Sequence, residues 1–196
     1  MLATFARRGA LSIYRSTDNG ETWAQFSEVA NLRGQPSLYE LPVKMGEFPA
    51  GTILAAGTGV PAADPAKRTL EVSASIDGGK TCGALIYDVA IADGLTRPGM
   101  TVVTRDGKGK CYMSYEVVGM SGQALEPRNN LAHFRTSMDG DNFGDFKIVG
   151  TLIQDRLRQY PNGTPFIAWS PWGGPDGTLI ASAVQSGATT MASSAG

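Results

Sequence analysis

The chain has 196 residues, of which 25 are glycine and 11 are proline, and its formal net charge is −1. This length suffices for the core of a single domain. The balanced charge argues against a nucleic-acid partner, which would require a clustered basic face. No apolar run approaches the roughly 18 residues of a membrane span, so we expect no membrane partner either.

The N-terminal region reads as β-structure. Residues 1–5 fit a strand, and the Arg7-Arg8 pair after them does not fit a signal peptide. Residues 11–15 alternate between apolar and polar side chains, as a half-buried strand does. From these residues we expect the chain to begin inside the fold.

Residues 16–23 read Ser-Thr-Asp-Asn-Gly-Glu-Thr-Trp, which has the form of a specified turn. The carboxylate of Asp18 can accept hydrogen bonds from nearby backbone N–H groups, as in Asx turns. Gly20 supplies a positive φ without steric strain. Trp23 then resumes a strand with a large apolar side chain. We predict a hairpin turn on the outer edge of a sheet, far from any pocket, in which Asp18 has a structural role.

The same turn pattern recurs at intervals of about 60 residues. The second copy contains Asp77 and Gly79, with Cys82 in place of the tryptophan. The third copy is degenerate and begins around Asp139. A second repeat alternates with the first: a proline that opens a strand is followed by a glycine that precedes an apolar strand. The prolines are Pro36, Pro98 and Pro165.

Together the two repeats give about four strands per period, an inner hairpin followed by an outer hairpin that the aspartate turn closes. Such units are typical of β-propeller blades. We predict an all-β propeller fragment of about three four-stranded blades over residues 1–184, with the inner strands side by side around a common axis. The Ser/Ala/Gly-rich residues 185–196 are expected to be a frayed C-terminus.

The turn at residues 16–23 resembles the Asp box, or bacterial neuraminidase repeat, of the sialidase superfamily. Several further motifs resemble the six-bladed exo-arabinanases: Gln35-Pro36, Arg97-Pro98-Gly99-Met100, Ser114-Tyr115-Glu116 and Trp169-Ser170-Pro171. The resemblance covers nearly the whole chain. It implies a secreted, monomeric, retaining glycosidase that takes an oligo- or polysaccharide substrate and uses no cofactor and no metal.

Glu116 is the candidate catalytic nucleophile. It is the only acidic residue in an apolar strand, where glutamate is depleted, and a partly buried carboxylate requires pairing or a function. By resemblance, Glu116 occupies the place of the nucleophile, and Arg97 and Tyr115 are candidate substrate-binding residues. For Arg97 an ordinary ion pair, and for Tyr115 simple packing, are the alternatives.

The chain departs from the exo-arabinanase pattern in one segment. The family carries a Trp-Glu-Pro segment, with the presumed acid/base glutamate, between the second Asp box and the Arg-Pro-Gly-Met strand. Residues 82–96 contain no glutamate, which suggests an internal deletion or a gene-model join near Thr81 and Cys82. Later blades of the family would follow Gly196. We therefore expect little or no hydrolytic activity from this chain alone.

Two other functions remain open at the level of sequence. The first is a non-catalytic propeller that binds carbohydrate or protein. The second is a sialidase proper, which would need Arg33, Arg97 and Arg128 to converge on a carboxylate. His133 has no nucleophile context and fits a packing or surface role. Cys82 and Cys111 could form one disulfide or remain two thiols.

Overall fold

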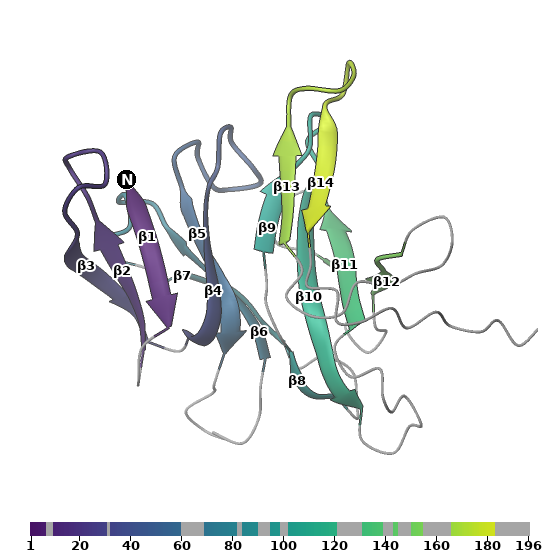
Figure 1. The fold of residues 1–196 in the computed structure, drawn as a ribbon, viewed down its shortest axis with the longest axis horizontal. Helices are drawn as coiled ribbons and strands as arrows, with labels where there is room; N and C mark the ends of the chain where they lie inside the picture. Colours follow the sequence, from purple (N-terminus) through teal and green to yellow (C-terminus); the bar gives the residue numbers. More distant parts are fainter. Residues whose placement is uncertain are drawn as a thin grey trace, which may run out of the picture.

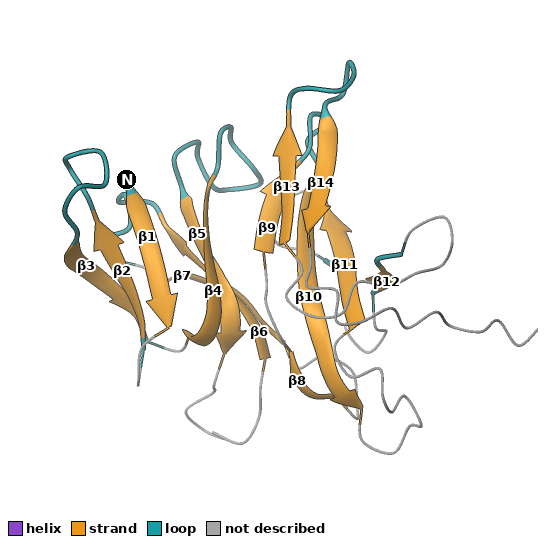
Figure 2. Ribbon diagram, viewed as in Figure 1, coloured by secondary structure: helices purple, strands orange, loops and turns teal. Residues whose placement is uncertain are grey.

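The computed structural model describes residues 1–6, 10–30, 32–59, 69–81, 84–89, 95–98, 102–120, 131–138, 143–144, 150–154 and 166–182. These residues form strands and turns that assemble into separate antiparallel sheets (Figures 1 and 2). Within the described part of the chain, no helix has the length and apolar character needed to cross a membrane. Residues 183–196 lie outside this part, so the frayed C-terminus stays a prediction.

The first sheet has three strands in chain order, β1 (Leu2–Ala6), β2 (Leu11–Arg15) and β3 (Ala24–Val29). Leu11 and Ile13 are fully buried on β2, as predicted, but Ser12 between them is buried too, so the expected half-buried alternation is wrong at this position. The first Asp box joins β2 to β3. The prediction of an outer hairpin turned by this box is therefore confirmed.

The second sheet is a complete four-stranded unit in chain order, β4 (Leu32–Glu40), β5 (Ile53–Gly59), β6 (Thr69–Ser75) and β7 (Ala84–Val89). The second Asp box joins β6 to β7. One detail of the prediction is wrong, because Pro36 lies inside β4 and does not open it. The register of β4 against β5 shifts between Gly34 and Ser37, and this irregularity accommodates a residue that has no N–H to donate.

The third sheet contains β8 (Leu95–Pro98), β9 (Val102–Arg105), β10 (Cys111–Met120), β11 (Leu131–Ser137) and β12 (Thr151–Leu152). Both β8 and β9 pair with β10, so together they fill one inner-strand position. Pro98 ends β8 and does not begin it, because the inner strand starts at Leu95. A fourth, two-stranded sheet contains β13 (Phe166–Ser170) and β14 (Thr178–Ser182).

The first sheet lies beside the second and the second beside the third, and the fourth sheet contacts the third, which it overlaps in Figure 1. The inner strand β9 lies against both β4 and β13, while each of these strands pairs only within its own sheet. They do not form one flat sheet, which confirms the predicted arrangement of the inner strands. The architecture is that of a β-propeller, and its strands amount to about three blades distributed over four sheets.

Two apolar clusters hold neighbouring sheets together. One joins the second sheet, through residues such as Leu54, Leu70 and Val72, to Met113 and Tyr115 of β10. The other joins the first two sheets and is formed by Leu11, Ile13, Val29, Leu32 and Ala55. The first three sheets therefore depend on their neighbours for burial of their faces, as blades of a propeller do.

The two Asp-box turns share one end of the molecule with several other described turns. In an antiparallel sheet the β4–β5 turn and the β6–β7 turn lie at the same end, because β4 and β6 run in the same direction. Figure 2 shows the β2–β3, β4–β5, β9–β10 and β13–β14 turns together at the top. We call this the Asp-box end.

Candidate functional site

The register of β10 places two of the predicted site residues on one face of the third sheet. Glu116 lies opposite Ala132 of β11, and Val118 lies opposite Arg97 of β8. Side chains alternate along a strand, so positions 116 and 118 share a face, and position 97 shares it with them. At Glu116 and Arg97 the structure describes the backbone alone. Their proximity is therefore a property of the strand register, and their roles stay predictions.

Tyr115 belongs to the core of the molecule. Its side chain is 0% exposed and lies in the cluster between the second and third sheets. The hydroxyl accepts hydrogen bonds from Nε of Arg135 at 3.2 Å and from the backbone N–H of Gly150 at 2.8 Å. This burial fits the packing role that was weighed for Tyr115 and gives no support to a contact with substrate.

His133 extends the same packed layer. It lies opposite Tyr115 in the register of β10 and β11, and its ring stacks on that of Tyr115 with centroids 6.0 Å apart. Its side chain is only 8% exposed. Of the two roles predicted for the single histidine, packing or surface, the structure shows packing.

The two described Asp boxes have the same internal hydrogen bonds. In the first, Ser16 Oγ donates to Asp18 Oδ1 at 2.7 Å, and the Gly20 N–H donates to Ser16 Oγ at 2.7 Å. The N–H of Thr22 donates to Asp18 Oδ1 at 3.0 Å, and its hydroxyl donates to Oδ2. The indole N–H of Trp23 donates to Gly20 O at 3.0 Å. The predicted turn chemistry is confirmed.

The second box repeats this network around Asp77. Ser75 Oγ donates to Asp77 Oδ1 at 2.7 Å, and the N–H of Gly79 donates to Ser75 Oγ at 2.8 Å. Thr81 donates its N–H at 3.0 Å and its hydroxyl at 2.6 Å to the same carboxylate. These bonds favour the ionised carboxylates and hold the pKa values of Asp18 and Asp77 well below the usual aspartate range, with the threonine hydroxyl as the largest cause.

The prediction that the Asp boxes lie far from any pocket is wrong. A groove of about 480 Å³ opens between the first two sheets, and Ser16 and Thr17 of the first box and Gly78 of the second line it. Neighbouring blades bring consecutive boxes to one end, where the space between two turns remains open. Spacing within one turn does not reveal a groove that forms between two sheets.

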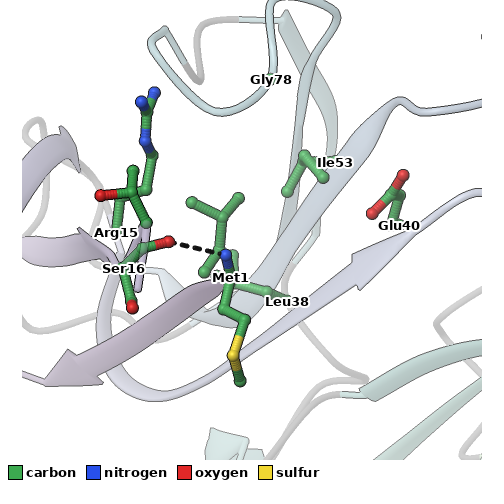
Figure 3. A pocket seen from close by; sticks show the side chains of 9 residues that line it. Met1, Arg15, Ser16, Leu38, Glu40, Ile53 and Gly78 are labelled. Carbon is green, nitrogen blue, oxygen red and sulfur yellow. Dashed lines mark hydrogen bonds between the residues drawn. The ribbon is translucent and has the colours of Figure 1, made fainter. Parts of the chain in front are cut away.

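The groove has charged walls and a partly apolar lining (Figure 3). Arg15 and Glu40 lie on opposite sides, with Met1 and Leu38 between them. The guanidinium of Arg15 lies over the ring of Phe26, 4.8 Å from its centroid, and the N-terminal ammonium of Met1 donates to Ser16 O at 2.9 Å. The groove lies between β1, β2, β4 and β5, and none of its lining residues comes from β8 or β10.

The sequence reasoning missed one buried acid, Glu71 of β6, which is 2% exposed. Ser73 Oγ donates to its Oε1 at 3.4 Å, and a Cβ added at Gly59 would lie 2.7 Å from its Oε2. A lone acid in an apolar strand, the signal used for Glu116, would have identified it. Its neighbours Leu70 and Val72 pack toward β10, so alternation places Glu71 on the face directed away from Glu116. Glu71 therefore does not take the place of the acid/base glutamate that the exo-arabinanase pattern has.

Several predicted residues lie outside the described part of the chain: Asp139, Cys82 and Arg128. For Arg33 only the backbone is described. Cys111 is buried in the cluster between the second and third sheets. The third Asp box, the pairing of the two cysteines and the convergence of three arginines therefore stay predictions.

Comparison with solved structures identifies the same architecture elsewhere. The chain is similar to the GH93 α-L-arabinofuranosidase of Fusarium graminearum in complex with arabinobiose, at 24% identity and a TM-score of 0.54, over 93% of this chain and 70% of that one. It is similar to the α-L-arabinanase of Penicillium chrysogenum with arabinobiose at the same identity and TM-score, over 93% and 71% of the two chains. No protein-family model and no curated protein matches the sequence. At this level of identity the likeness establishes the shared fold.

Proposed function

We propose that this protein is a propeller of glycoside hydrolase lineage that takes arabinan or a related glycan, with Glu116 as the nucleophile of a retaining, exo-acting reaction. The observation that carries this proposal is the register of β8, β10 and β11, which places Glu116 and Arg97 on one sheet face. The shared architecture with two arabinobiose-bound proteins supports the choice of ligand. The site of action would be extracellular, where such glycans occur.

In a retaining mechanism, the Glu116 carboxylate attacks the anomeric carbon and forms a glycosyl-enzyme, which water then hydrolyses. A second carboxyl group about 5–5.5 Å away protonates the departing oxygen. Arg97 would donate hydrogen bonds to substrate hydroxyls. Within the described residues, we assign no carboxyl group to the acid's place. We therefore expect binding without efficient cleavage of the polymer.

A non-catalytic module that binds carbohydrate is the second candidate function. The reason for considering it is that residues 82–96 contain no glutamate, whereas the exo-arabinanase pattern has its acid/base glutamate in this segment. General acid assistance contributes on the order of 10²- to 10⁴-fold, so its loss would leave a binding protein with residual chemistry at most. The two candidates share the ligand and differ only in turnover.

The test is incubation of the purified full chain with linear arabinan and with an aryl arabinobioside, beside Glu116→Gln. The aryl group leaves with little protonation, so we expect slow turnover of the aryl substrate, loss of that turnover in Glu116→Gln, and almost no release from the polymer. Rapid release of arabinobiose that depends on Glu116 would show that another acid serves the reaction. Turnover that survives Glu116→Gln, with arabinan binding also absent, would reject both candidates.

A matched control keeps the test specific. Glu28 is an exposed acid of β3 whose Oε1 accepts from Nε2 of Gln25 at 2.7 Å. Glu28→Gln changes the charge by the same amount in a different sheet. It should leave both turnover and arabinan binding unchanged.

A further inference from the structure

The three tryptophans of the chain serve two different purposes. Trp23 and Trp169 fasten turns, because their indole N–H groups donate to Gly20 O at 3.0 Å and to Asp176 O at 3.1 Å. Trp172 is 81% exposed, and its indole N–H has no acceptor among the described residues. The indole of Trp172 therefore fastens no turn of the described fold, and its large flat apolar face and its N–H donor are open to a ligand.

The turn that carries Trp172 is held in a fixed shape. Three of its glycines, Gly173, Gly174 and Gly177, have positive φ values of 100°, 150° and 72°. The N–H of Gly177 donates to Gly174 O at 3.1 Å. A Cβ at Gly177 would lie 2.3 Å from Nε1 of Trp169, so the base of the turn packs directly on that indole. The turn therefore presents Trp172 at little further cost in conformational entropy on binding.

Polar groups accompany the exposed ring. Asp176, in the same turn, forms an ion pair with Lys108 of the β9–β10 turn, with Nζ and Oδ2 2.9 Å apart. Both side chains are more than half exposed, at 64% and 56%. A Cβ at Gly107 would lie 2.5 Å from Asp176 O, so the two turns touch. Figure 1 shows the β13–β14 turn projecting beyond the sheets at the Asp-box end.

We propose that the β13–β14 turn is a surface subsite for a glycan chain, with Trp172 as its stacking platform and Lys108 and Asp176 as its polar rim. A sugar ring has an apolar C–H face and an edge of hydroxyls. The first suits the flat indole of Trp172, and the second suits an acceptor on the same turn, Asp176, and a donor on the turn that touches it, Lys108. The ion pair carries both signs, which does not favour an anionic membrane or a phosphate. The choice of arabinan as first ligand rests on the proposed function.

The subsite is separate from the candidate catalytic position. Glu116 lies five residues along β10 from Cys111, which is roughly 17 Å at the rise of a strand and leads away from the β9–β10 turn. A chain held at Trp172 would therefore occupy the Asp-box end and would not touch Glu116. Its role would be to keep the protein on the polymer.

The experiment is affinity electrophoresis of the full chain in gels that contain linear arabinan, arabinogalactan, xylan or galactan. We expect at least one glycan to retard the protein and Trp172→Ala to weaken that retardation about tenfold. Trp172→Phe should retain part of it. Trp23→Phe is the matched control at the same end, and Glu28→Gln is a control at an exposed acid of the first sheet; both should be retarded as the parent chain is.

The outcomes separate this proposal from the proposed function. Loss of retardation in Trp172→Ala alone, with an unchanged thermal unfolding midpoint, supports the subsite whether or not hydrolysis is detected. A parent chain that no glycan retards, or a Trp172→Ala chain retarded like the parent, overturns it. Loss of aryl arabinobioside turnover in Glu116→Gln with unchanged retardation in Trp172→Ala would overturn the subsite and leave the proposed function standing.

Discussion

The two described Asp boxes have the same hydrogen bonds to their aspartates and differ in the other contacts that they make. In both, one carboxylate accepts from a serine hydroxyl and from the N–H and hydroxyl of a threonine. The first box closes on itself through Trp23, whose indole donates to Gly20 O. The second docks on the neighbouring sheet, where the hydroxyl of Ser27 donates to Gly79 O. The same local motif is thus a self-contained turn in the first box and a contact between two sheets in the second box.

The burial of the two boxes follows this difference. Gly79 is buried, whereas Gly20 is half-buried. A Cβ at Gly79 would lie 3.3 Å from Cδ1 of Leu2 and 3.8 Å from Cε1 of Phe26 in the first sheet. A Cβ at Gly20 would meet only the box's own Trp23 at 3.7 Å and Met1 at 3.8 Å. A change in the second box should therefore also disturb the contact between the first two sheets.

The largest expected effect is that of alanine at these two glycines. Both have a positive φ, 95° at Gly20 and 88° at Gly79, which costs an alanine about 1–2 kcal/mol. Gly79→Ala also crowds Leu2, so we expect it to destabilise the chain by roughly 1 kcal/mol more than Gly20→Ala. Urea unfolding of both variants gives the two values. Equal losses would mean that the second box does not fasten the sheets.

The two aspartates should respond alike to pH, because their hydrogen bonds are alike. Their folded pKa values lie below the unfolded value of about 3.9, so their stabilising effect is complete at neutral pH and is lost as the pH falls below about 4. We expect Asp18→Asn and Asp77→Asn to lower the unfolding midpoint at pH 7, and the gap to the parent chain to narrow at pH 3. A gap that stays constant between these pH values would contradict the ionised hydrogen bonds.

The smallest effect is expected from the hydrogen bond between blades. Ser27→Ala removes the donor to Gly79 O and should cost about 1 kcal/mol. Thr17→Ala, at an exposed position of the first box, is the control and should change stability by less than about 0.5 kcal/mol. Denaturant unfolding of the two variants makes the comparison. A loss at Thr17 as large as that at Ser27 would remove the evidence for a specific bond between blades.

The local turn chemistry could be predicted from sequence because all of its partners lie within a few residues. Asp18 reaches Ser16 and Thr22 regardless of what the rest of the chain does. The prolines show the limit of such reasoning. Pro36 was assigned to a strand start, but β4 begins at Leu32, because a shift in register against β5 accommodates a residue that donates no hydrogen bond.

The candidate site was only partly predictable. The acid in an apolar strand identified Glu116, and the strand register then brought Arg97 to the same face. Tyr115, its neighbour in sequence, alternates to the opposite face and is buried. The same signal was present at Glu71 and was overlooked. Its position relative to Glu116 depends on which face of β6 packs on β10, which periodicity within one strand cannot supply.

The sequence by itself determined the repeating unit: strands that alternate, turns that Asp18 and Asp77 close, and a period of about 60 residues that predicts propeller blades. These features depend on short-range hydrogen bonds and on side-chain alternation. Only the tertiary structure decided that the second box lies against Leu2 and Phe26, that a groove opens between the two boxes, and that Trp172 is left exposed. These features depend on packing between sheets, where residues far apart in the chain meet.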